Sequence, residues 1–129
     1  MPLEYITVVP DPFLLMYSSD PVHWKAFHTA LVELSQGKID SFGVHQLPGW
    51  EGIGGCSLTA RLSGRDRGIW RIGELAFECS LTRLWWENCE DMVAAFMDTQ
   101  DWTLHRHQYV FSPAGQPNLE WCLSTNKEW

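Results

Sequence analysis

Two histidines one residue apart, His105 and His107, have the residue type and the spacing of metal ligands. Side chains two apart on a β-strand point to the same face, so both imidazoles would reach the same ion. Two ligands do not complete a site, because a protein-bound ion needs further ligands, and the histidines at positions 23, 28 and 45 are scattered. The alternative is a solvent-facing strip of a strand. We expect this alternative and no bound metal.

A glycine-rich loop, Pro48 to Gly55, has the composition of a phosphate-binding loop. Such a loop follows a strand and opens a helix. Here the next residues, Cys56 to Leu62, alternate with period two, which predicts a strand instead. We therefore expect no phosphate site. Residues 49–55, with His105 and His107, remain the candidate site of an alternative interpretation, in which the chain is a small enzyme or a metal- or ligand-binding domain.

The remaining nucleophile and thiol patterns indicate no reaction. The sequence has no Gly-x-Ser-x-Gly elbow, and the cysteines at 56, 79, 89 and 122 form no Cys-x-x-Cys pair. In the absence of an export signal, buried free thiols are a better expectation than disulfides. We therefore predict no catalytic residue, no cofactor and no enzymatic activity.

The charged residues are unevenly distributed along the chain. The formal net charge is −7, and residues 74–101 alone hold seven acidic side chains against one arginine, a formal charge of −6. Four of the nine cationic side chains, at 61, 65, 67 and 71, lie on or beside one turn. An acidic chain disfavours nonspecific binding to nucleic acid and to anionic membranes, because both depend on cationic contacts. A basic protein is the partner that this distribution favours.

The acidic segment includes a predicted helix, residues 81–98, whose first turn also fits the end of a strand. On a helical wheel, one side forms a core stripe of Trp85, Cys89, Met92 and Phe96. Trp86 falls about 100° from Trp85, at the border of an acidic face. Apolar anchors beside carboxylates are typical of a protein-binding surface; packing of Trp86 under a neighbouring strand is the alternative. The predicted partner-binding residues are Trp86, Glu87, Glu90, Asp91, Met97 and Asp98.

Local patterns predict the elements that position these residues. Helix 21–36 has the strongest signals: Asp20 before Pro21 at its start, Gly37 at its end, and apolar residues at helical spacing between them. Strands are predicted at 4–9, 13–17, 38–47, 56–62, 69–79, 101–111 and 119–125, with 56–79 forming a hairpin. This order predicts an α+β fold, an antiparallel or mixed sheet with two helices on one face.

Length and composition predict one globular domain spanning residues 1–129. With 129 residues, of which 45% are hydrophobic, the chain is long enough to bury a core without disulfides or metal. The N-terminus has no cationic stretch before an apolar one. No segment approaches the ~20 apolar residues that span a bilayer. We therefore expect a cytoplasmic protein.

An acidic chain of this length, rich in tryptophan, with an early helix, a central hairpin and a helix carrying WWENCEDM, resembles the small bacterial immunity proteins that neutralise toxins of contact-dependent inhibition and related systems. The resemblance covers the layout of the chain and rests on no diagnostic motif. It implies that the chain binds and occludes a cognate toxin. Because many such toxins are basic nucleases, it also implies an acidic contact surface.

A homodimer that uses Trp86 as its own interface is a further alternative.

Overall fold

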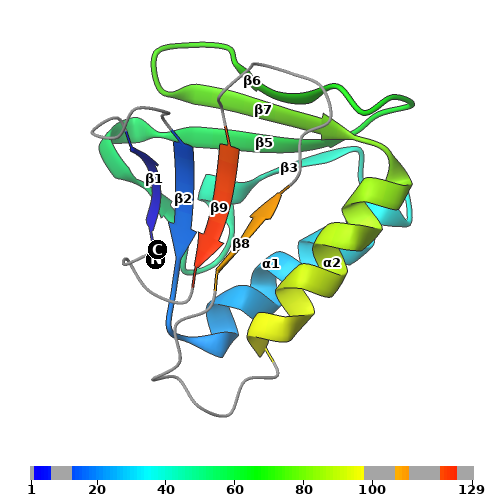
Figure 1. Cartoon of the computed structure of the whole chain (residues 1–129), viewed down its shortest axis with the longest axis horizontal. Helices are drawn as coiled ribbons and strands as arrows, with labels where there is room; N and C mark the ends of the chain where they lie inside the picture. The colour runs from blue at the N-terminus through cyan, green and yellow to red at the C-terminus, as the bar shows by residue number, and fades with distance from the viewer. Residues whose placement is uncertain (1, 7–12, 98–106, 111–119, 125–129) are drawn as a thin grey trace.

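The computed structural model describes residues 2–6, 13–97, 107–110 and 120–124. These residues form the predicted α+β fold, with two helices and mixed-sheet strands (Figure 1). The helices are α1 (Pro21–Ser35) and α2 (Arg83–Met97). They lie side by side and antiparallel, because Trp24 near the start of α1 contacts Phe96 near the end of α2, with ring centroids 4.8 Å apart. Neither is long and apolar enough to cross a membrane, and the described ranges contain no other α-helix.

The strands divide between two sheets, whereas the sequence pattern predicted one. The first sheet has the order β4 (Glu51–Gly52), β1 (Pro2–Ile6), β2 (Phe13–Tyr17), β9 (Glu120–Ser124), β8 (His107–Val110). The second has the order β3 (Ser41–Gly43), β5 (Ser57–Leu62), β7 (Ala76–Leu81), β6 (Gly68–Arg71). Each sheet is mixed, because β2 runs parallel to β9 and β5 parallel to β7. The strands of one sheet run across those of the other (Figure 1).

One hydrophobic core joins both sheets and both helices. Leu14 and Trp121 enter it from the first sheet, Leu58 and Phe77 from the second. Alternation of side chains along the strands sends these residues to one face. A smaller cluster on the other face of the first sheet consists of Ile6, Leu15 and Cys122, with Tyr17 at its edge. Each sheet therefore has one face that closes the main core.

Helix α1 confirms its sequence prediction. The Asp20 carboxylate accepts a hydrogen bond from the backbone N–H of Val22 at 2.9 Å, and Pro21 occupies the first turn. The chain leaves the helix through Gly37, whose φ of +75° is a conformation that glycine adopts without strain. The apolar residues at helical spacing in this segment are Trp24, Phe27, Leu31 and Leu34, and all four are fully buried. These are local signals, and they are sufficient to place this helix.

The predicted hairpin over residues 56–79 is wrong in its pairing. A turn interrupts the second predicted strand, where the N–H groups of Ile72 and Gly73 both donate to the carbonyl of Ala76, at 2.8 and 3.2 Å. Strand β7 then folds back along β6 and lies between β6 and β5, pairing with β5 in parallel. A glycine inside a strand pattern is a known signal of such a break.

The start of α2 resolves whether residues 80–86 form a helix or a strand. Strand β7 ends at Leu81, and the helix begins at Arg83. Between them, the N–H and the hydroxyl of Thr82 both donate to the Asp66 carboxylate at 2.8 Å. The Thr82 carbonyl accepts the first hydrogen bond of the helix, from the N–H of Trp86, at 3.0 Å. Asp66 thus fixes the residue from which α2 starts and places negative charge at the positive end of the helix dipole.

We expect Asp66→Ala to lower the free energy of unfolding by about 1–2 kcal/mol, because two donors lose their acceptor and the helix start loses its anchor. Urea unfolding followed by circular dichroism measures this loss. The neighbouring exposed residue provides the control, since Arg65→Ala should change stability by less than about 0.5 kcal/mol. Equal effects of the two substitutions would rule out the anchoring role of Asp66.

Candidate functional site

The burial of the two adjacent tryptophans of α2 is the reverse of the prediction. Trp86, predicted to border the acidic face, is 0% exposed, whereas Trp85, predicted to close the core, is half-buried. The indole N–H of Trp86 donates to the Arg61 carbonyl at 3.0 Å, and its ring meets the ring of Trp121 edge to face. Trp86 is therefore a core residue. It is not available to a partner or as the contact of a homodimer.

The error is one of helix phase. The buried stripe consists of Trp86, Cys89, Val93 and Phe96, whereas the predicted stripe was Trp85, Cys89, Met92 and Phe96. The two stripes share Cys89 and Phe96 and differ by one residue at the other two positions, where both choices are apolar. A wheel has no means of separating them. The deciding contacts are the bond from Trp86 to β5 and its packing on β9, which are remote in sequence.

The corrected phase defines the surface of α2 that faces away from the core. Leu84 is 66% exposed, and Asn88 and Asp91 are also exposed. With half-buried Glu87, these residues follow the i, i+3, i+4, i+7 spacing of a single helix surface. We call Leu84, Glu87, Asn88 and Asp91 the outer face of α2. Sequence reasoning missed Leu84; a wheel referenced to Trp86 places it about 200° from that core anchor.

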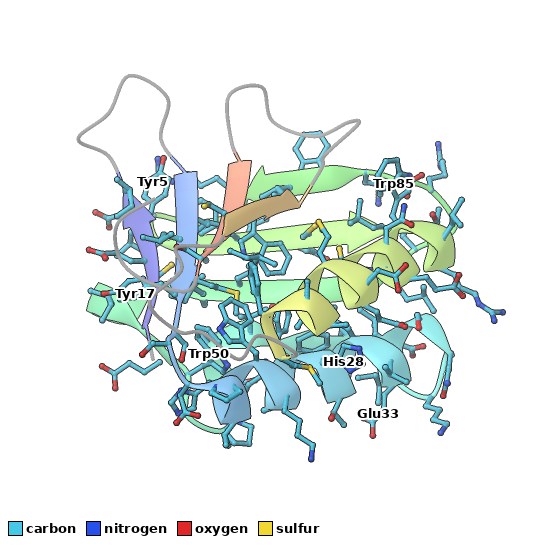
Figure 2. All side chains as sticks on the ribbon, turned by 60° about the horizontal axis from the view of Figure 1, so that its bottom comes forward. Tyr5, Tyr17, His28, Glu33, Trp50 and Trp85 are labelled. Atoms are coloured by element: carbon cyan, nitrogen blue, oxygen red, sulfur yellow. The ribbon has the colours of Figure 1, made fainter. Side chains whose placement is uncertain are left out.

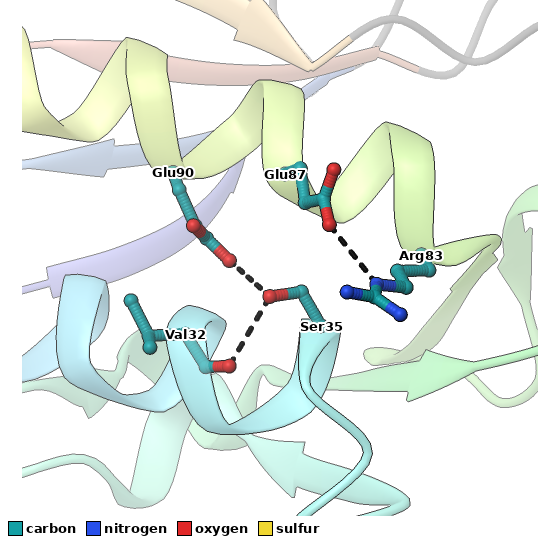
Figure 3. A network of polar contacts seen from close by, with 5 residues as sticks. All are labelled: Val32, Ser35, Arg83, Glu87 and Glu90. Atoms are coloured by element: carbon teal, nitrogen blue, oxygen red, sulfur yellow. Dashed lines mark hydrogen bonds and ion pairs between the residues drawn. The ribbon is translucent and has the colours of Figure 1, made fainter.

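The acidic residues of α2 have different local roles (Figure 3). Glu87 accepts a hydrogen bond from exposed Arg83 at 3.0 Å, an i, i+4 ion pair. Glu90 instead accepts a hydrogen bond from the hydroxyl of Ser35 at the end of α1, and that hydroxyl also contacts the Val32 carbonyl. Glu90 therefore joins the two helices, while Glu87 and Asp91 remain on the outer face.

Two further predicted contact residues lie elsewhere. Met97 is half-buried and packs against the core at the last turn of α2. Asp98 lies outside the described residues. Figure 2 places Trp85 beside the start of α2, well apart from Trp50, which lies near the start of α1. The structure thus brings Glu87 and Asp91 together with Leu84, and separates them from Trp86 and Met97.

The four cysteines are free and buried, as predicted. Burial, with a smaller contribution from Glu90, raises the pKa of the Cys89 thiol from its ordinary 9.0 to about 12. Burial and Glu4 raise the pKa of Cys56 to about 11. Burial also raises the pKa of Cys79, with smaller contributions from Cys89 and Glu78. Since the thiolate is the nucleophile, these three side chains are poor nucleophiles at neutral pH.

We expect these thiols to react with a disulfide reagent only when the chain unfolds. The raised pKa values keep the folded thiols protonated, whereas the thiols of the unfolded chain ionise near pH 9.0. The free energy of unfolding therefore keeps its full contribution from these thiols below pH 9.0 and falls as the pH rises toward about 12. Labelling by Ellman's reagent at about pH 8 should therefore be slow in buffer and fast in denaturing urea. Fast labelling of the folded protein would contradict the assigned burial.

The alternative metal and ligand site is not tested by the described residues. His105 lies outside them, and His107 is described only as part of the backbone of β8. Within the described ranges, no three ligand-type side chains come together in a way that would hold a metal ion. In the glycine-rich loop, Trp50 is buried and its indole donates to the His23 carbonyl at 3.0 Å. This tryptophan therefore packs the loop onto α1.

Comparisons with known proteins identify no relative. No family model, no curated protein and no solved structure matches the chain.

Proposed function

We propose that the chain is a binding protein that neutralises a basic, nuclease-type toxin by covering its active or substrate-binding surface, and that it contacts the toxin through the outer face of α2. The observation that carries this proposal is the exposure of Leu84, at 66%, on the same helix surface as Glu87 and Asp91. A large apolar side chain supplies buried area on binding, and the two carboxylates that follow it along the helix select a cationic partner.

The acidic charge of the whole chain suits a rapid encounter with a basic protein. The chain has a formal charge of −7, and residues 74–101 contribute −6 of it. Such a field raises the rate of association with an oppositely charged protein. The pair between Glu87 and Arg83 lies on the surface, where ion pairs are worth at most about 1 kcal/mol. Glu87 can therefore exchange Arg83 for a cation of the partner at small cost.

The fold supports a rigid contact surface. Helix α2 is anchored at its start by Asp66, in its middle by Glu90 and Ser35, and along its inner side by Trp86 and Phe96. A preorganised helix loses little conformational entropy on binding. Inhibition by occlusion needs no catalytic group, and we place the protein in the cytoplasm, where a delivered toxin would act.

The proposal predicts that a gene beside this one encodes a toxin domain, and the test uses that domain. Cells that express this domain alone should stop growing, and co-expression of the chain should restore growth. The purified chain should bind the purified domain. Failure to restore growth, or a neighbouring gene with no toxin domain, would count against the proposal.

A further inference from the structure

The second sheet has a face turned away from the core, and this face is hollowed. Alternation along the strands directs Arg61 of β5, Glu78 and Ser80 of β7, and Trp70 of β6 to this face. The strand register aligns Arg61 with Ser80 and Trp70 with Glu78. A groove of about 520 Å³ crosses these strands. It lies on β5, β7 and β6, and none of its lining residues belongs to α2.

The groove has an apolar side formed by β6 and the residue after it. The ring of Trp70 is 44% exposed and Ile72 is 62% exposed, and both line the groove together with Leu62. Most large apolar side chains in the described ranges are buried, so two exposed ones at one groove are informative. Trp in particular combines a large contact area with low conformational entropy, and it is common at the centres of protein interfaces.

The polar side of the groove includes one cation that is not paired with any described residue. Arg61 forms an ion pair with Glu78. The guanidinium of Arg67 forms no hydrogen bond or ion pair with any described residue, since only its backbone N–H is engaged. Ser80 is only 5% exposed and also lines the groove. A hydroxyl that lines a groove can donate a hydrogen bond to a ligand atom.

We propose that this groove binds a protein segment in which a carboxylate side chain stands beside an apolar one. The carboxylate pairs with the guanidinium of Arg67 and accepts a hydrogen bond from the hydroxyl of Ser80. The apolar side chain packs against Trp70 and Ile72. The lining residues carry two arginines against one glutamate, a local excess of positive charge in a chain of net charge −7. The groove therefore selects an acidic segment, whereas the outer face of α2 suits a basic protein.

The shape of the groove favours a protein segment over a small molecule. Small-molecule sites enclose most of their ligand. Here Trp70 and Ile72 form an open rim, so a ligand of similar volume to the groove would keep much of its surface in water. A protein segment covers the rim with its own neighbouring residues, as in interfaces where surrounding contacts exclude water.

Selection of a random phage-displayed peptide library on the immobilised full chain tests the proposal. We expect the enriched peptides to share Asp or Glu next to an aromatic or aliphatic residue. The synthetic form of the most enriched peptide should bind Arg67→Ala about tenfold more weakly than the unmodified chain. A peptide in which the Asp is replaced by Asn, or the Glu by Gln, should bind the unmodified chain with a similar loss of affinity. Arg65→Ala is the matched control, because Arg65 lies on the same turn but does not line the groove.

Three results would overturn the proposal. The selection yields no peptides with the acidic and apolar pair, the Arg67→Ala and Arg65→Ala variants bind the peptide equally, or phenylacetate alone binds as tightly as the peptide. The last result would assign the groove to a small carboxylate. The outcome does not depend on whether α2 binds a toxin, because no toxin is used.

Discussion

Trp86→Ala should lower the free energy of unfolding by about 3–5 kcal/mol, as for other large core residues replaced by alanine. The side chain is fully buried, and it fills the space between the start of α2, β5 and β9. Its removal leaves a cavity and also leaves the Arg61 carbonyl without its donor. A loss of this size is a large fraction of the stability of a typical domain. Urea unfolding followed by circular dichroism measures it.

Two control variants separate the causes. Trp85→Ala should cost much less than Trp86→Ala, because Trp85 is only half-buried. Trp86→Phe keeps a six-membered ring but removes the indole N–H and part of the ring volume, so we expect a smaller loss, of about 1–3 kcal/mol, from the unpaired carbonyl and a smaller cavity. Equal losses for the alanine variants at 85 and 86 would contradict the corrected helix phase.

The sequence predicts those elements whose signals are local. Helix α1 has its capping aspartate, its first-turn proline and its terminal glycine within the same short segment. Strand β5 shows its alternation directly, because Leu58 and Ala60 are buried while Arg61 is exposed. In both cases, signals from neighbouring residues were enough to predict the element.

Predictions that depend on distant contacts were less successful. The parallel pairing of β5 with β7 requires β6 to lie outside both strands, and no local pattern distinguishes this order from a hairpin. The choice between Trp85 and Trp86 as core residue depends on Arg61 and Trp121, far from α2 in sequence. Pairing order and helix phase are therefore the two features for which local reasoning lacked information.

The candidate sites also have features that local signals predict and features that only distant contacts determine. The acidic character of Glu87 and Asp91 was evident from composition, but the exposed anchor beside them, Leu84, depends on the helix phase. The groove was not predicted at all, because it forms only when the turn after β6 places Trp70 beside Glu78 and brings Ser80 beside Arg61. The cluster of arginines at 61–71 was the one sequence signal that pointed toward this region.

Reversal of charge on the outer face of α2 should have the largest functional effect. We expect Glu87→Lys with Asp91→Lys to slow association with the toxin domain by about 10- to 1000-fold at low salt, because the partner then meets cations where it met carboxylates. The salt dependence of the association rate should decrease as well.

Leu84→Ala should act mainly on dissociation and weaken binding about tenfold, through lost apolar contact.

The dissociation constant of the Glu87→Lys, Asp91→Lys double variant, measured beside a matched control, is the most direct test of the proposed function. The control is Glu51→Lys with Glu74→Lys, which makes the same change in net charge at exposed residues outside α2. We predict weak binding by the α2 variant and near-normal binding by the control, with both proteins folded. Equal binding by the two variants would show that net charge, and not the outer face of α2, governs recognition.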